Sequence, residues 1–312
     1  MAEHKGRRLL RYDLLIIVVT IIWGGTFLVV QDTLKLTGPF TFLFLRFGVG
    51  ALTLALLFHR RLRQIQRSEL LAGSFIGIFL FAGFALQTVG LQYTTVSKAG
   101  FITGLYVPFV SLLSLLVLKQ IPTIMVWAGV ILSFVGLIFL SINSTFQLTF
   151  GLGEWLVLGC ALANALHIIS ISKFAPRADA INLSIVQIAF TSLLSLLAIP
   201  FAHEPLHLPA ASVWISVVFM GVVATAFCLY VMNRVQQFIS STRATLIYAL
   251  EPAWAALFGY VFARDLLSPL AWLGCLCIFL GMIIGQLPPP AFLRKRSSVN
   301  EPVETVELSS GR

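Results

Sequence analysis

Apolar runs of about 20 residues follow one another almost without pause from Leu14 to Leu287. The hydrocarbon core of a bilayer is roughly 30 Å thick, and a helix that rises about 1.5 Å per residue crosses it in about 20 residues. Only 11% of the 312 residues are charged, whereas a soluble domain carries about a quarter. Because so few charges cannot cover a water-facing surface, the sequence predicts an all-α integral membrane protein.

The apolar runs predict ten transmembrane helices in two groups of five. The expected helices are 13–33, 38–58, 69–90, 99–118 and 122–142 in the first group, and 152–172, 180–200, 212–233, 243–263 and 267–287 in the second. The implied organisation is an N-terminal segment, a first repeat, an outside linker loop, a second repeat and a cytoplasmic tail, at 1–12, 13–142, 143–151, 152–287 and 288–312. The tail has too little apolar surface to order itself, and we expect it to be disordered.

Basic residues predict how these helices are oriented. If the ten helices alternate in direction, only Lys35, Lys98 and Arg264 fall on the side opposite to the N-terminus, and Arg46 lies within a helix. All the other lysines and arginines fall on the N-terminal side. Cytoplasmic loops carry such an excess of Lys and Arg. We therefore expect both termini in the cytoplasm and the protein in the cell inner (plasma) membrane, and the net charge of +9 does not indicate nucleic-acid binding.

A weak internal repeat relates the two groups of helices. Matching residues lie 144 positions apart and then, after a slip of one residue, 145 positions apart: Gly77/Gly221, Gln92/Gln236, Ser97/Ser241, Pro108/Pro252, Gly129/Gly274 and Gly136/Gly281. Because each group holds an odd number of helices, the second copy would enter the membrane inverted relative to the first. Inverted repeats around a central site are the architecture of alternating-access carriers.

The motifs of the chain resemble those of the EamA-type carriers of the drug/metabolite transporter superfamily. Three motifs carry the resemblance, similar to the family's Trp-Gly-small-x-Phe, Leu-Arg-Phe and Glu-Pro signatures: Trp23-Gly24-Gly25-Thr26-Phe27, Leu45-Arg46-Phe47 and Glu251-Pro252. The family usually has glutamate where Gln120 and Asp265 stand. The resemblance extends over nearly the whole apolar length. It implies two inverted five-helix repeats around a central cavity, often in an exporter, and it does not imply a substrate.

Two ionisable side chains are predicted to lie inside the bilayer, where each costs about 3 kcal/mol or more. From the rise per residue, Arg46 is expected about 10 Å from one membrane edge and Glu251 about 12 Å from the other, so that their heights differ by only about 8 Å. Glu251 is expected to bind a cationic group or a coupling proton, and Arg46 to bind an anionic group or to balance Glu251. Alternatively, Arg46 bonds helix carbonyls or headgroups, and Glu251 is protonated or satisfied beside Pro252.

Polar and aromatic residues within the predicted helices complete the candidate substrate site: Trp23, Thr26, Gln87, Tyr106, Asn164, His167, Gln187 and Tyr248. Any single Gln or Asn among them has the alternative role of bonding a neighbouring helix. Pro108 and Pro252 fall near the middles of their helices at matched positions of the two repeats. Since a proline inside a helix frees a carbonyl and kinks the chain, we predict that both are hinges, with a static kink as the alternative.

These features favour a secondary transporter that moves a small metabolite, an amino acid or related compound, by alternating access and in the export direction. Drug or organic-cation efflux and metabolite uptake are the alternatives. The expected partners are a small-molecule substrate and the lipid bilayer, with the proton as candidate coupling ion and a monomer or homodimer as the assembly. No metal, other cofactor or nucleic acid is expected.

Other classes of membrane protein are less consistent with the sequence. A membrane-embedded enzyme is a distant alternative, because His-Glu-x-x-His and Gly-x-Ser-x-Gly motifs are absent from the sequence. A P-loop is absent too, so an ion gradient, exchange or the substrate's own gradient must drive transport. A receptor would need a soluble domain or long loops, and a channel would need a recurring polar stripe; the sequence has neither.

Overall fold

The computed structural model describes residues 2–118, 123–141, 150–204, 210–239, 244 and 247–287. Within these ranges the chain is all-α, and they contain no β-strand. Most of the expected linker loop (143–149) and the whole expected tail (288–312) lie outside the described residues.

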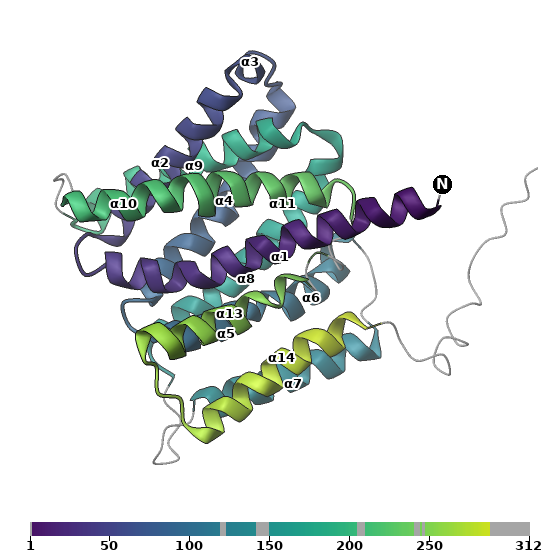
Figure 1. Ribbon diagram of the computed structural model, residues 1–312, viewed down its shortest axis with the longest axis vertical. Helices are drawn as coiled ribbons and strands as arrows, with labels where there is room; N and C mark the ends of the chain where they lie inside the picture. The colour runs from purple at the N-terminus through teal and green to yellow at the C-terminus, as the bar shows by residue number, and fades with distance from the viewer. Residues whose placement is uncertain are drawn as a thin grey trace, which may run out of the picture.

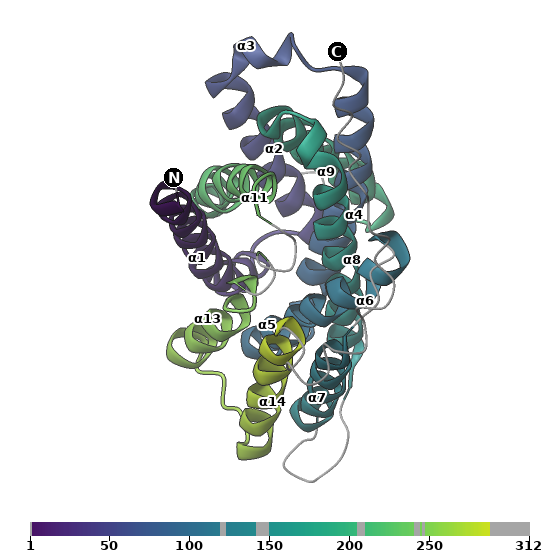
Figure 2. The same cartoon turned by 90° about the vertical axis from the view of Figure 1, so that its right-hand side faces the viewer.

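The helices follow one another in the order that the apolar runs predict. The first half contains α1 (Ala2–Thr33), α2 (Pro39–Leu57), α3 (His59–Leu62), α4 (Arg67–Gly90), α5 (Val96–Gly104), α6 (Tyr106–Leu118) and α7 (Ile124–Ser141). The second half contains α8 (Leu152–Phe174), the 3-10 turn η1 (Ala175–Arg177), α9 (Ala180–Phe201), α10 (Ala211–Phe219), the π-helix η2 (Met220–Phe227), α11 (Cys228–Gln236), α13 (Glu251–Phe258), the π-helix η3 (Gly259–Ala263) and α14 (Pro269–Gln286). Figures 1 and 2 both place α7 and α14 side by side at one edge of the molecule, and α3 at the opposite edge.

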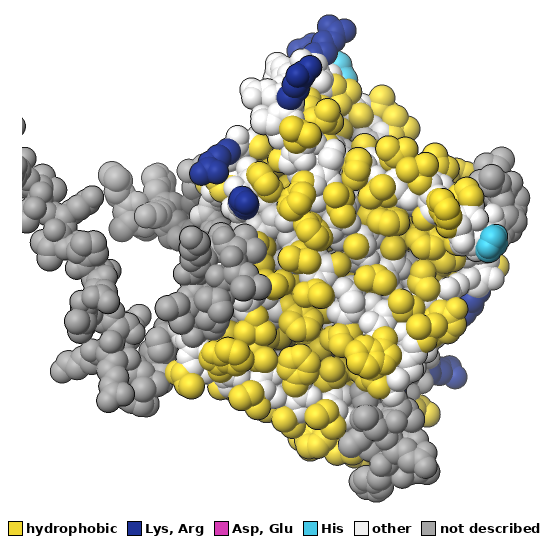
Figure 3. Space-filling view, turned by 180° about the vertical axis from the view of Figure 1, so that it is seen from behind, with side chains coloured by type: hydrophobic (Ala, Val, Ile, Leu, Met, Phe, Trp, Pro, Cys, Tyr) yellow, Lys and Arg dark blue, Asp and Glu magenta, His cyan; other side chains and the backbone are white. Residues whose placement is uncertain are grey.

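The described residues contain seven segments that are long and apolar enough to cross a bilayer: Arg11–Thr33, Pro39–Leu57, Arg67–Gly90, Val96–Ser114, Leu152–Arg177, Ala180–Phe201 and Ala211–Gln236. Two further apolar helices, Ile124–Leu140 and Pro269–Gly285, are shorter. The segment expected to form the ninth crossing, 243–263, contains α13 and η3, and its residues 243, 245 and 246 lie outside the described residues. Hydrophobic side chains cover the face seen in Figure 3, and Lys and Arg lie only near its margins. The chain therefore has the composition of a multi-pass membrane protein, and the count of ten remains a prediction.

The structure corrects three boundaries expected from the sequence. The helix expected at 99–118 is broken at Leu105 into α5 and α6, and Pro108 lies in the first turn of α6. Pro252 likewise lies in the first turn of α13. A proline cannot bond the carbonyl four residues earlier, but it is tolerated in a first turn, where the N–H has no helical partner. Each proline therefore begins a helix instead of kinking the middle of one. In addition, α1 begins at Ala2, so residues 2–12 of the expected N-terminal segment are helical.

Charged residues divide the molecule into two ends. The basic end is defined by Arg60, Arg61, Arg63, Arg67, Lys173, Arg177 and Arg234, and it also holds Glu69 and Asp179. Arg61 pairs with Asp179 there at 3.7 Å, which places α3 beside the start of α9. The acidic end is defined by Asp32, Glu154, Glu204 and Asp265, and its basic residues are Lys35, Lys98 and Arg264.

Glycines allow close contact between the halves at two corresponding places. A Cβ atom at Gly77 in α4 would lie 3.1 Å from the carbonyl oxygen of Gln187 in α9. A Cβ atom at Gly221 in η2 would lie 2.8 Å from the carbonyl oxygen of Arg46 in α2. Since larger side chains would force these backbones apart, glycine is needed at both crossings.

The helices α7 and α14 make a similar close contact. A Cβ atom at Gly136 would lie 2.6 Å from the carbonyl oxygen of Gly274, and one at Gly281 would lie 2.6 Å from the carbonyl oxygen of Gly129. As the residue number rises along α7 it falls along α14, so the two helices run antiparallel.

Carboxylates from one half of the chain bind the starts of helices in the other half. Glu204, which follows α9, accepts hydrogen bonds of 2.8 Å from the backbone N–H groups of Phe40 and Thr41 and from the Thr41 hydroxyl. These groups begin α2, where four N–H groups have no partner within the helix and the helix dipole favours negative charge. Glu204 thus fixes α2 to the end of α9.

The other end of the molecule has a counterpart of this contact. Glu69, in the first turn of α4, accepts from the backbone N–H of Asp179 at 2.8 Å and from the side-chain amide of Asn182 at 2.7 Å, at the start of α9. At the acidic end, Asp265 accepts from the backbone N–H of Ser97 at 2.8 Å and so caps α5. Each carboxylate therefore joins two segments from different halves of the chain at one end of the molecule.

Replacing Glu204 with glutamine is expected to lower the free energy of unfolding by about 1–3 kcal/mol, because charge-assisted bonds to a helix start become bonds to a neutral amide. Thermal unfolding in one detergent measures the change. The matched control is Asp32→Asn, since Asp32 is exposed and, within the described part of the chain, its ion pair is with exposed Lys35, a kind of pair worth about 0–1 kcal/mol. Equal losses in both variants would contradict the assigned role of Glu204.

Candidate functional site

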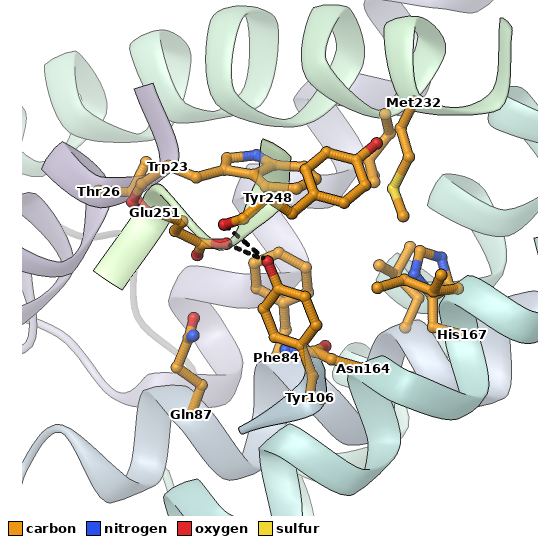
Figure 4. Close-up of a pocket in the computed structure, with 14 residues that line it drawn as sticks. Trp23, Thr26, Phe84, Gln87, Tyr106, Asn164, His167, Met232, Tyr248 and Glu251 are labelled. Carbon is orange, nitrogen blue, oxygen red and sulfur yellow. Dashed lines mark hydrogen bonds between the residues drawn. The ribbon is translucent and has the colours of Figure 1, made fainter. Parts of the chain in front are cut away.

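A cavity lies between helices of both halves of the chain (Figure 4). It is lined by Trp23, Thr26, Leu80, Gly83, Phe84, Gln87, Tyr106, Asn164, His167, Ile168, Leu229, Met232, Tyr248 and Glu251. The empty space between these side chains, with its opening, amounts to about 550 Å³, and about 50 Å³ of it admits the centre of a water molecule. The cavity in this conformation is therefore narrow.

Among the described residues that line this cavity, Glu251 supplies the carboxylate. It is 7% exposed and is the first residue of α13, where the helix dipole favours a negative charge. The Tyr106 hydroxyl lies 3.3 Å from Glu251 Oε2 and 3.1 Å from the carbonyl oxygen of Tyr248, and donates to them. That carbonyl is free because the residue four positions later is Pro252, which has no N–H. The proline break thus creates part of the wall that positions Glu251.

Glu251 has no cationic partner within the described part of the chain. A buried carboxylate in that position is costly unless it is protonated or meets a positive group. The cavity can therefore hold a proton or a small cation such as an ammonium group at Glu251.

Aromatic rings form the wall beside Glu251. The rings of Trp23 and Tyr248 are tilted against each other with centroids 5.9 Å apart. Trp23 Nε1 donates to the carbonyl oxygen of Ala224 in η2 at 2.9 Å, which fixes the indole ring. Aromatic faces attract cations and pack well against apolar side chains. This wall and Glu251 together favour a solute that carries a positive charge.

Polar groups from α4 and α8 face this wall. His167 Nε2 lies 2.9 Å from Gln187 Oε1, and Asn164 donates to Cys160 Sγ at 3.3 Å. Gln87 lies 3.5 Å from the Thr103 hydroxyl. Figure 4 shows His167 and Met232 at the side of the cavity away from Glu251. Gln187 itself does not line the cavity, and it holds the imidazole ring from behind.

Arg46 is also outside the cavity lining, although the sequence predicts it as a substrate ligand. Its side chain is 1% exposed, and Nε donates to the Thr225 hydroxyl at 2.8 Å. The guanidinium carbon lies 4.7 Å from the ring centre of Phe84 and 5.4 Å from that of Phe47. Phe84 lines the cavity, so its ring stands between the cavity and Arg46. Arg46 and Glu251 form no ion pair with each other in the described part of the structure.

The structure brings most of the predicted site residues together. Of these, eight line one cavity: Trp23, Thr26, Gln87, Tyr106, Asn164, His167, Tyr248 and Glu251. The residues that sequence reasoning missed are apolar or small, such as Leu80, Phe84 and Met232. One face of α4 carries Leu80, Gly83, Phe84 and Gln87 at helical spacing. The polar Gln87 therefore indicated which face of α4 lines the cavity.

Comparison with known proteins relates the whole chain to transporters. The model of the EamA-like transporter family matches residues 10–142 and again residues 151–285. An uncharacterized transporter of Archaeoglobus fulgidus is 32% identical over 283 residues, which cover 91% of this chain and 88% of the relative. The uncharacterized transporter YoaV of Bacillus subtilis is 25% identical over 281 residues, which cover 86% of this chain and 94% of that protein.

A solved crystal structure shares the fold. It is 18% identical in sequence, its TM-score is 0.66, and the match covers 89% of this chain and 98% of the other. The family match, the relatives and the apolar helices agree on a multi-pass membrane transporter with a small-molecule substrate. The chain belongs to the EamA-like transporter family.

Proposed function

We propose that this transporter is a secondary carrier that exports a small metabolite, an amino acid or a related compound, across the cell inner membrane by alternating access. The observation that carries the proposal is Glu251, a buried carboxylate without a cationic partner among the described residues, in a narrow cavity with aromatic walls. An ammonium group fits this environment, since it can pair with the carboxylate and face the rings of Trp23 and Tyr248.

The proposed architecture is ten helices arranged as two inverted five-helix repeats. The contact of Gly77 with Gln187 and the contact of Gly221 with Arg46 support it, because Gly77 and Gly221 are 144 positions apart and Arg46 and Gln187 are 141 positions apart. Exchanging the two halves turns one contact into the other. The double match of the family model agrees with this relation. Two similar halves can exchange conformations and open the central site first to one side and then to the other.

The proposed orientation places the basic end in the cytoplasm, with both termini, because cytoplasmic loops are richer in Lys and Arg. Both halves of the chain contribute residues to the cavity lining, so the proposed transporting unit is a monomer, with a homodimer as the alternative.

The proposed coupling ion is the proton. Glu251 can hold either a proton or the ammonium group of the substrate, and competition between them gives exchange of one for the other. The other titratable side chains that face the cavity are Tyr106, His167 and Tyr248. With this competition, a proton gradient that is acidic outside drives the substrate outward, because the proton enters as the substrate leaves.

An organic-cation efflux carrier is the second candidate, supported by the same carboxylate and aromatic wall. Only about 50 Å³ of the cavity admits the centre of a water molecule, far less than the roughly 300–1,000 Å³ of pockets that hold drug-sized ligands, and this favours the smaller substrate. Uptake of a metabolite would use the same site with the gradient reversed.

Counterflow into liposomes tests the proposal directly. Purified protein is reconstituted, the vesicles are loaded with unlabelled compound, and a panel of labelled amino acids and organic cations is offered with and without a pH gradient. Saturable exchange of an amino acid is the expected result. Exchange of cations alone would favour the second candidate, and no exchange by protein that is folded and inserted would count against both.

A further inference from the structure

Arg46 is a buried positive charge, and the described residues place no negative charge beside it. Its guanidinium makes one hydrogen bond, from Nε to Thr225, and Nη2 has no hydrogen-bond partner among the described residues. No described carboxylate lies within ion-pair distance of it. The rings of Phe47 and Phe84 supply only cation–π attraction, about 2 kcal/mol when desolvated. An ion inside a protein without a partner costs several kcal/mol.

The place of Arg46 limits what can supply the missing negative charge. Lipid headgroups and solvent do not reach a side chain that is 1% exposed. On one side Arg46 faces η2 through Thr225, and on another the ring of Phe84, which also lines the transport cavity. The cavity is therefore the nearest compartment from which an anion can come, and among the described residues Phe84 both lines the cavity and contacts the guanidinium.

We propose that Arg46 is the anion subsite of the carrier and that it binds the carboxylate of the substrate after the ring of Phe84 turns aside. This inference rests on the proposed function, and it narrows the substrate class to small zwitterions, with the ammonium group at Glu251 and the carboxylate at Arg46. A guanidinium binds a carboxylate through two parallel hydrogen bonds. Binding would satisfy Nη2 and balance a charge that is otherwise unpaired.

The π-helix η2 links this subsite to the opposite wall. Thr225 of η2 binds Arg46, and the preceding residue, Ala224, accepts the hydrogen bond of Trp23. A π-helical segment in a membrane helix is a frequent feature of functional sites. A carboxylate that draws Arg46 towards the cavity will therefore act on η2 and, through Ala224, on the indole ring beside Glu251. Binding at Glu251 and binding at Arg46 are thereby coupled through η2.

The test compares recognition of a carboxylate in the wild type and in Arg46→Met. Methionine replaces the buried charge with an apolar chain of similar length, a change that is often neutral or stabilising for buried ions. We expect the variant to melt no lower than the wild type in detergent. An amino acid and its amide are used as competitors of counterflow. The wild type should prefer the amino acid at least about 10-fold, which corresponds to 1.4 kcal/mol, and Arg46→Met should reduce that preference to about one.

Two further variants complete the test. Arg63→Met, which removes an exposed arginine of the basic end, should keep the wild-type preference. Phe84→Leu removes the shielding ring while keeping Arg46, and should strengthen inhibition by the amino acid relative to the amide. If Arg46→Met does not fold, Phe84→Leu still tests whether Arg46 is the anion subsite.

The outcomes separate this inference from the proposed function. A wild type that transports amino acids and amides equally, or a folded Arg46→Met protein with an unchanged preference, overturns the anion subsite alone. The same holds if Phe84→Leu leaves the preference unchanged. A wild type that transports no member of the panel overturns the proposed function and this inference with it.

Discussion

Replacing Glu251 with glutamine is expected to reduce proton-driven transport at least about 100-fold while the protein folds normally. Glutamine keeps the shape of the side chain and can still accept the hydrogen bond of Tyr106. It has no charge to attract an ammonium group and cannot take up a proton in the membrane. Loss of a buried charge partner typically costs about 3–5 kcal/mol, which is a factor of 100 or more in affinity.

Two measurements separate the roles that Glu251 can play. Uptake driven by an imposed pH gradient depends on proton binding, whereas exchange of labelled for unlabelled substrate without a gradient depends on substrate binding alone. Loss of both rates in Glu251→Gln would mean that the carboxylate binds the substrate. Loss of only the gradient-driven rate would mean that it binds the proton. The control is Asp32→Asn, an exposed acid of the acidic end, and unchanged pH-dependent flux in Glu251→Gln would refute the assignment.

Many residues of the cavity lining were predictable because polar side chains are rare in the apolar runs of this chain. A polar or aromatic side chain inside an apolar run needs a partner or a cavity, and residues such as Trp23, Asn164 and Glu251 were found in this way. The rise per residue gave a membrane depth for Arg46 and Glu251 alone. The scarcity of polar and aromatic side chains in apolar runs therefore predicted most of the polar residues that line the cavity.

The direction in which a side chain points around its helix was not predictable from depth. Arg46 and Gln187 lie at suitable positions along their helices, but they face η2 and His167 instead of the cavity. The ring of Phe84, an apolar residue in an apolar helix, gave no sequence signal that it separates Arg46 from the site. Sequence spacing gives height, whereas neighbouring helices fix which face is turned inward.

The fold shows the same division between what local sequence determines and what packing determines. The positions of apolar runs predicted where helices occur, and the bounds of α2, α8 and α9 differ from expectation by one or two residues. The break at Leu105 was missed because Pro108 was read as a kink within a helix. Both α5 and α6 pack on α8, and α5 packs in addition on α13, which lies against it at Gly100 and Gly104. Tertiary contacts of this kind are not written in the local pattern.

The contact between α5 and α13 is where a single substitution is expected to stop the transport cycle. A Cβ atom at Gly100 would meet the side chain of Ala255, and one at Gly24 in α1 would lie 3.0 Å from the backbone nitrogen of the same residue. These glycines let α13 fit closely between α1 and α5. The segment continues to Asp265, which caps α5 at the acidic end, and we predict that this contact closes the route from the cavity to that end.

Gly100→Leu is expected to lower transport about 100-fold without preventing membrane insertion. The leucine side chain would wedge α5 away from α13, and overpacking of this kind costs about 1–3 kcal/mol, enough at its upper value to shift a conformational equilibrium about 100-fold. The matched control is Gly25→Leu, a substitution of equal size in α1, where a Cβ atom meets only the ring of Phe258 at 3.5 Å. Counterflow by the two variants measures the difference.

Labelling from one side of the membrane identifies the state in which Gly100→Leu is held. Thr26→Cys, in a background without the four native cysteines, places a thiol on the cavity wall for reaction with an impermeant maleimide. If the glycine contact closes the acidic end, Gly100→Leu raises labelling from that side and leaves labelling from the basic end low. Lost transport with unchanged labelling would mean that the wedge blocks the site itself. Because α13 carries Glu251 at its first residue, opening of this contact would also move the carboxylate, and the proposed alternating access and substrate binding would then depend on one helix.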